Sequence, residues 1–166
     1  HYCISNTAQA RRLAALGGKA SVNVYFVHSR AQMHAEHGFG PDRSEATARL
    51  GTLAREGVTF AVHSDFNLVV SPLRPLQAVW TSVNRIGADG ETVLAPGERI
   101  SLDRALRAIT IDAAHILRRD HELGSLEVGK LADLTVLDDD PYSVPAMQVK
   151  DIAVHETVLG GEPQPA

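Results

Sequence analysis

The sequence has 166 residues, 44% of them hydrophobic, with 16 Lys and Arg against 20 Asp and Glu, which is typical of one ordinary soluble domain or two small lobes. A formal charge of −4 and a pI near 6.0 leave no basic surplus to neutralise a phosphate backbone, so we expect no nucleic-acid partner. Polar residues interrupt every apolar stretch before the roughly 20 residues of a membrane span, so we expect no membrane segment. The single cysteine, Cys3, excludes an internal disulfide and is compatible with a reducing compartment, which favours the cytoplasm.

The start of the sequence shows no targeting segment. The first residue is His1, and nothing before Thr7 has the charged and then apolar pattern of a secretion signal. We therefore interpret the sequence as a portion of a longer protein, whose upstream residues would hold any chemistry missing from it.

The first elements predicted are a helix, a strand and a connection. A helix over 7–16, capped by Thr7, ends at two glycines that favour the left-handed turn of a helix terminus. Residues 20–27 become wholly apolar, which is typical of a strand buried on both faces, and His28 ends it. Residues 29–41 have weak periodicity and predict an irregular connection with at most one helical turn.

A strand–helix–strand order follows from the next two segments. Apolar residues recur at helical spacing over 44–56, and Gly57 separates this helix from a second strand over 58–62. Such alternation favours parallel strands whose carboxyl ends gather binding residues. His28 and the pair His63 and Asp65 fall at these ends.

The second half predicts two helices and then short strands. Residues 76–83 form a helix in which Trp80 is core or pocket wall, residues 87–97 a loop, and residues 101–116 a strongly amphipathic helix capped by Ser101. From residue 122 the residue pattern changes and predicts short strands over 124–129, 131–137 and 152–159. The chain is expected to fray from Glu162 to Ala166.

The pair His63 and Asp65 is the main candidate for chemistry. Residues two apart on a strand point the same way, so both side chains would face one crevice, where they suit a metal ion. A carboxylate on zinc also takes a proton from the metal's water. A hydrogen-bonded loop anchor is the competing interpretation.

The other histidines carry weaker signals. His28 suits a ligand, a substrate contact or a structural imidazole bonded to a carbonyl, and His34 and His37 are three apart in a segment that favours solvated side chains. Phosphate loops, nucleophile elbows and the zinc-protease helix motif are absent from the sequence.

Three motifs resemble the amidohydrolase superfamily. Residues 57–65 (GVTFAVHSD), followed by 71–80 (SPLRPLQAVW), resemble its last barrel strand, and residues 101–114 (SLDRALRAITIDAA) resemble its final barrel helix. Residues 124–138 (GSLEVGKLADLTVLD) resemble its return into a small β-sandwich. Among its branches the chain is most similar to amidohydrolase family 3, the YtcJ-like branch, whose members include deformylases.

The resemblance covers nearly the whole chain and implies an α/β fold. It implies the C-terminal part of a (β/α)₈ TIM-type barrel over residues 1–121 and a C-terminal β-sandwich segment over 122–166. A complete barrel needs about 250 residues, so only its last strands and helices would be present.

The resemblance also implies a site. Asp65 would be a metal ligand and the catalytic base, His1 a late metal ligand, and His28 and His63 would contact substrate. The cofactor would be a divalent metal, zinc in the complete protein, and none need bind to this portion, because the family's early His-x-His ligands are absent. His63 departs from the family, which places a small residue before Ser-Asp.

Two functions from different classes follow. The first is the C-terminal portion of a metal-dependent amidohydrolase that hydrolyses non-peptide carbon–nitrogen bonds in a small amide-like substrate. The alternative is a non-catalytic regulatory or binding module. Open barrel edges further predict a homo-oligomer or association with the missing barrel half.

Overall fold

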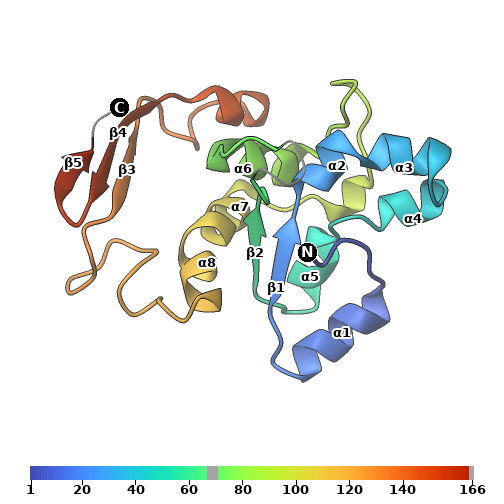
Figure 1. Ribbon diagram of the computed structural model, residues 1–166, viewed down its shortest axis with the longest axis horizontal. Coiled ribbons are helices and arrows are strands. Elements are labelled where there is room, and N and C mark those ends of the chain that lie inside the picture. The colour runs from blue at the N-terminus through green and yellow to red at the C-terminus, as the bar shows by residue number, and fades with distance from the viewer. Residues whose placement is uncertain (67–70, 165–166) are drawn as a thin grey trace.

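The computed structural model describes residues 1–66 and 71–164 as a mixed α/β chain with two separate small sheets (Figure 1). Its elements are, in chain order, α1 (Thr7–Ala15), β1 (Ala20–Asn23), α2 (Tyr25–Ser29), α3 (Ala31–His37), α4 (Pro41–Glu45), α5 (Leu50–Arg55), β2 (Phe60–His63), α6 (Pro75–Asn84), η1 (Pro96–Glu98), α7 (Leu102–Ile109), α8 (Ile111–Ile116), β3 (Leu134–Leu137), η2 (Ala146–Asp151), β4 (Val154–Leu159) and β5 (Glu162–Gln164).

The first sheet is the parallel pair β1–β2, in register from Ala20 opposite Phe60 to Asn23 opposite His63. This confirms the predicted strand–helix–strand crossover. Helices α6, α7 and α8 contact β2, and α5 and α1 lie against each other beyond the pair. The core between these layers is apolar and fully buried at Val22, Phe60 and Leu53. Removing such side chains from water is the main term that stabilises this arrangement.

The second sheet is antiparallel, in the order β3–β4–β5, with a bulge between Val136 and Leu137. It lies at the end of the molecule opposite α1 to α4 (Figure 1). Strands were predicted over 131–137 and 152–159, whereas the predicted strand over 124–129 is wrong, because this segment consists of turns and coil. The fraying predicted from Glu162 to Ala166 is wrong over Glu162–Gln164, because β5 pairs with β4, and its last two residues lie outside the described residues. The structure shows one sheet here, so the sandwich stays a prediction.

The segment η2 joins the second sheet to the rest of the chain by packing on α6. The indole nitrogen of Trp80 donates to the carbonyl of Met147 at 3.0 Å, and the Asn84 side-chain amide donates to that of Ala146 at 3.0 Å. Trp80 itself is buried, as the sequence predicted.

The strand predicted over 20–27 is wrong in its second half. β1 ends at Asn23, whose side-chain oxygen accepts a hydrogen bond from the backbone nitrogen of Tyr25 at 3.1 Å, and α2 begins there. Most of this run is buried, so its apolar pattern does not distinguish a strand from a buried helix. His28 therefore lies on α2 and not at a strand end. The irregular connection predicted over 29–41 is helical over most of its length, as α3 and the start of α4.

The helices predicted over 44–56 and 101–116 are both interrupted. Between α4 and α5, Thr47 pairs with Ile4 in an isolated bridge, and Ala48 has a φ of +47°. Between α7 and α8, Thr110 leaves the helical region with φ −123° and ψ −102°. The cap predicted at Ser101 is confirmed, since its Oγ accepts from the backbone nitrogen of Arg104 at 3.2 Å.

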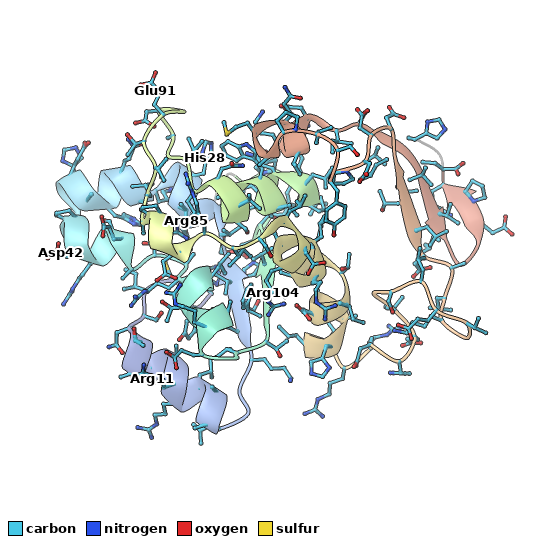
Figure 2. All side chains as sticks on the ribbon, turned by 180° about the vertical axis from the view of Figure 1, so that it is seen from behind. Arg11, His28, Asp42, Arg85, Glu91 and Arg104 are labelled. Carbon is cyan, nitrogen blue, oxygen red and sulfur yellow. The ribbon has the colours of Figure 1, made fainter. Side chains whose placement is uncertain are left out.

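A buried arginine holds the break between α4 and α5. Arg85 is 0% exposed, and its guanidinium donates to the carbonyls of Leu94 at 2.7 Å, Ala48 at 2.8 Å and Thr47 at 2.9 Å (Figure 2). Burial lowers the pKa of Arg85 to about 10, so the group is still cationic at pH 7. These charge-assisted bonds join two loops that are distant in the sequence.

A buried carboxylate anchors η1 on α5. Glu98 accepts from the backbone nitrogen and the hydroxyl of Thr52, both at 2.6 Å, and from Nε of Arg49 at 3.0 Å. Burial by itself raises the pKa of Glu98, but the hydrogen bonds from Thr52 and Arg49 outweigh it and leave the pKa below its ordinary value.

None of the helices in the described part of the chain combines the length and the apolar character needed to cross a bilayer.

Candidate functional site

Two of the predicted site residues meet at the carboxyl ends of the parallel strands. Nε2 of His1 and Oδ2 of Asp65 are 2.7 Å apart, although the residues are 64 positions apart in the sequence. His1 is placed beside the end of β1, because its carbonyl accepts from the backbone nitrogen of Asn23 at 3.4 Å. Asp65 follows β2 by two residues, so the parallel pairing brings the two side chains together.

The backbone at Asp65 is unusual. Its φ is +53°, in the left-handed region that non-glycine residues seldom adopt, though aspartate tolerates it better than most. The side-chain amide of Asn23 donates to the carbonyl of Ser64 at 3.3 Å and fixes the preceding residue. The loop is thus held so that the carboxylate of Asp65 faces His1.

The imidazole of His1 is in contact with two other rings. The ring of His63 stands edge-on to it, with centroids 5.3 Å apart, and the ring of Phe26 lies at 5.8 Å. Burial lowers the pKa of His63, while the charge of Asp65 opposes the shift. His63 is therefore a neutral imidazole at pH 7, able to donate at one nitrogen and accept at the other.

The remaining predicted residue, His28, contacts a different part of the molecule. From α2 its Nδ1 lies 3.0 Å from the carbonyl of Ile86, and its ring stands edge-on to Trp80 with centroids 5.6 Å apart (Figure 2). These contacts place it against the loop after α6. Its role in substrate binding stays a prediction.

The donors suit a metal ion, but the set is small. Imidazole nitrogen and carboxylate oxygen are both zinc ligands, and His1 and Asp65 offer one of each within 2.7 Å. Over residues 1–66 and 71–164, no group of three or more His, Cys, Asp and Glu side chains lies close enough to hold a metal. The described part of the chain therefore brings together two possible donors here, fewer than the three or four protein ligands of a zinc site.

Two residues of this site, Asn23 and Phe26, were not predicted from the sequence. Asn23 interrupts an apolar run, and that isolated amide is the signal for the anchor on Ser64. Phe26 carried no signal, because its place beside His1 depends on β1 ending early.

One cavity of the structure lies beside this site, and another lies away from it. One of about 210 Å³ reaches His63 and is walled by Tyr25, Val62 and Ala78 among others. The hydroxyl of Tyr25 donates to the carbonyl of Arg74 at 2.7 Å, and burial raises its pKa to about 12. This cavity adjoins the candidate site and is mostly apolar.

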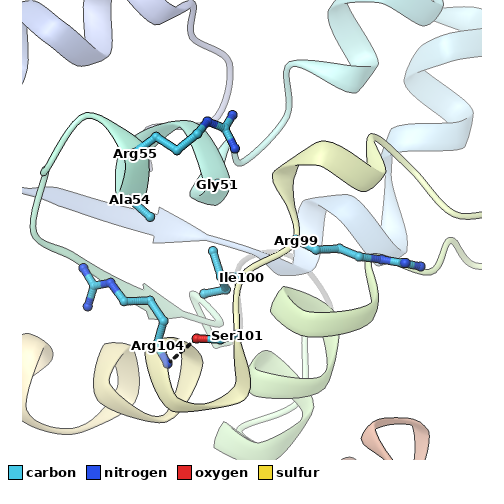
Figure 3. Close-up of a pocket in the computed structure, with 7 residues that line it drawn as sticks. All are labelled: Gly51, Ala54, Arg55, Arg99, Ile100, Ser101 and Arg104. Atoms are coloured by element: carbon cyan, nitrogen blue, oxygen red, sulfur yellow. Dashed lines mark hydrogen bonds between the residues drawn. The ribbon is translucent and has the colours of Figure 1, made fainter.

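The other cavity, of about 300 Å³, lies between α5 and the start of α7, away from His1 and Asp65. Figure 3 shows the side chains of Arg55, Arg99 and Arg104 leaving it in three directions, with their guanidinium groups pointing away. Each is bonded elsewhere, Arg55 to Gly97 and Arg99 to Asn84, for example. No polar groups converge in this cavity, so we assign it no ligand.

Comparisons with known proteins find relatives in both sequence and structure. Residues 1–164 match the profile described as Amidohydrolase family. The N-substituted formamide deformylase of Arthrobacter pascens is 31% identical over 166 residues, which are 97% of this chain and 29% of that protein. An uncharacterised metal-dependent hydrolase from Pyrococcus horikoshii superposes with a TM-score of 0.74 at 23% identity, covering 88% of this chain and 29% of that one.

An adenosine deaminase from Xanthomonas campestris with bound zinc superposes with a TM-score of 0.68 at 22% identity, covering 98% of this chain and 35% of that one. At this identity the two structures show a shared fold. The chain spans about a third or less of the length of these three proteins.

Proposed function

The chain belongs to the amidohydrolase family, and from this we propose that it forms the part of a metal-dependent hydrolase that supplies the last ligands of the metal centre. The reaction is hydrolysis of a carbon–nitrogen bond other than a peptide bond. The observation that carries the proposal is the 2.7 Å pairing of His1 with Asp65 at the carboxyl ends of parallel strands, where α/β folds place their ligands.

The two side chains fit a divalent ion, zinc being our choice, as part of its ligand set. When bound, such an ion would polarise the carbonyl of an amide and make a nearby water molecule more acidic. Nε2 of His1 would bind the ion. Asp65 would be a second ligand of the ion, and its carboxylate would be the base that accepts a proton from water.

The neighbouring side chains would handle the substrate. His63, neutral at pH 7 and in ring contact with His1, would hydrogen-bond the amide, and His28 would line the wider pocket. The apolar cavity beside His63 suits a small hydrophobic substituent on the amide nitrogen. The name of the Arthrobacter pascens relative, an N-substituted formamide deformylase, supports formamides as the first class to test.

The rest of the catalytic centre would come from outside the described residues. We propose that the chain works with further barrel strands, supplied by the same protein or by a second copy, because its first sheet has two strands and a closed barrel has eight. The division at residue 121 into a barrel portion and a C-terminal portion is part of the same proposal.

One observation favours a second function. The described residues hold no group of three metal-binding side chains. If no other strands complete the ligand set, the chain alone would be a non-catalytic regulatory or binding module. Metal content separates the two functions, since a module of this kind needs no ion at His1 and Asp65.

The test is metal stoichiometry by mass spectrometry, after dialysis against a weak chelator, on the chain and on Asp65→Asn and His1→Gln. The matched control is Asp138→Asn, because Asp138 forms a similar but more exposed pair with His155 at 3.1 Å. Because two donors are only part of a zinc ligand set, we expect partial zinc occupancy in the unaltered chain and the control, and a clearly lower occupancy in the two site variants.

A second measurement follows formate release from N-substituted formamides with added zinc. Release that depends on Asp65 but not on Asp138 supports the hydrolase. The proposal is contradicted if the unaltered chain takes up no zinc, or if Asp65→Asn takes up as much zinc as the unaltered chain. The non-catalytic module then remains.

A further inference from the structure

Three titratable side chains are linked on the surface at the opposite end of β1. Nζ of Lys19 lies 2.7 Å from Nε2 of His115, and Nδ1 of the same imidazole lies 2.9 Å from Oδ2 of Asp120. Lys19 directly precedes β1, His115 is on α8, and Asp120 follows α8. Because His1 and Asp65 lie past the other end of the strands, this group is separate from the candidate metal site.

The contacts fix where the protons are. A lysine ammonium has only donors, so Nε2 of His115 must accept from it. The proton of the neutral ring is then on Nδ1 and is donated to Asp120. A carboxylate that orients an imidazole toward a nucleophile is the arrangement by which proteins activate hydroxyl and thiol groups, and here the third group is an amine.

Lys19 differs from the other two lysines of the sequence. Nζ of Lys150 is bound by both carboxylate oxygens of Asp151, at 2.7 and 2.9 Å, and Nζ of Lys130 lies 3.4 Å from a carboxylate oxygen of Glu127. A carboxylate partner favours the ammonium form, which has no lone pair with which to attack. Of the three, Lys19 is the lysine whose Nζ contacts an imidazole nitrogen.

The surroundings leave this group available. Lys19 is exposed, so a reactant can reach it. The hydrogen bond from His115 lowers the pKa of Asp120, and His121 adds a smaller effect, so the carboxylate is charged at neutral pH. Asp112, the acidic residue on α8, is paired with Arg104 and Arg107.

We propose that Lys19 is an acylation site for acyl thioesters, with His115 as its base and Asp120 as the residue that orients the base. Lys19 gives one proton to Nε2 of His115, and the lone pair of the amine attacks the thioester carbonyl carbon. The new carbon–nitrogen bond forms, the carbon–sulfur bond breaks, and the sulfur leaves with the electron pair. The thiolate takes a second proton from the amine nitrogen, and the imidazolium returns its proton to water.

The test uses the full chain with S-acetyl-N-acetylcysteamine at pH 7.5 and follows acetylation of each lysine by peptide mass spectrometry. Lys130 and Lys150 are internal references in the same molecule, so unequal protein concentration or reagent dose between variants does not alter the comparison, and circular dichroism of each variant checks that it is folded. We expect Lys19 to react at least about tenfold faster than Lys150, a lower bound for a general base at an exposed site.

Four variants decide the outcome. His115→Gln should bring the ratio of Lys19 to Lys150 acetylation close to one, and Asp120→Asn should lower it in part. His155→Gln removes a histidine paired with an aspartate elsewhere, and Cys3→Ser removes acyl transfer through the thiol; both should leave the ratio unchanged. A ratio near one in the unaltered chain, or a ratio that survives His115→Gln, overturns the proposal.

Discussion

Replacing Arg85 with methionine tests whether a buried cation holds the fold together. Methionine fills a similar volume without a charge, so the change removes the three guanidinium bonds to the carbonyls of Thr47, Ala48 and Leu94. A buried acceptor that loses its donor costs roughly 1–3 kcal/mol. Three such losses are partly offset, because a buried cation no longer has to be desolvated. We expect the free energy of unfolding to fall by about 3–5 kcal/mol.

The assay is urea unfolding followed by far-ultraviolet circular dichroism, with the slope of the transition checked for each protein. Arg99→Met is the matched control, because Arg99 is exposed and its Nε makes one bond, to the carbonyl of Asn84 at 3.0 Å. The control should lose about 1 kcal/mol or less. Equal losses in the two variants would refute the reasoning, since the desolvation of the buried cation would then cancel its bonds.

Two further predictions concern stability. Because the pKa of Glu98 is below its ordinary value of 4.5, the unfolded chain binds a proton more readily, and the stability from this group is present above pH 4.5 and is lost as the pH falls through the folded pKa. The free energy of unfolding of Glu98→Gln should be about 1–3 kcal/mol lower at pH 7 than that of the unaltered chain, and it should fall less between pH 7 and pH 3. Urea unfolding at a series of pH values measures both, and equal pH dependence of the two proteins would contradict this prediction. Gly124 and Gly129 both have positive φ, at +88° and +96°, but only at Gly124 does an added Cβ meet neighbours, 2.8 Å from Cβ of Ala114. Gly124→Ala should therefore lower the melting temperature more than Gly129→Ala, and equal shifts would show that the crowding relaxes freely.

The sequence predicted elements whose signals are local. Ser101 caps its helix as expected, and the apolar pattern of 76–83 indicated α6 within one residue at each end. At α1 the helix was right, but Asn6 is the cap and not Thr7, because Asn6 forms a reciprocal pair with Gln9. The parallel pairing of β1 and β2 followed from the order of the elements.

Features that depend on distant residues were not predictable in this way. The break at Thr47 and Ala48 is held by Arg85, which lies 38 and 37 residues further along the chain. At the site, resemblance to a family indicated that His1 and Asp65 belong together, whereas the spacing of the histidines did not. The bond between Lys19 and His115 joins residues 96 positions apart, and neither has a sequence neighbour that signals it.

Trp80 gives this protein a built-in optical reporter. It is the single tryptophan of the sequence, buried on α6, with its indole nitrogen bonded to Met147 of η2. Its fluorescence emission therefore reports on the contact between α6 and η2, which connects the part of the chain with the parallel pair to the C-terminal sheet. Emission that changes together with the helical signal during unfolding means that both parts unfold as one cooperative unit. An earlier change means that the C-terminal sheet separates first and leaves the strands beside His1 and Asp65 in place.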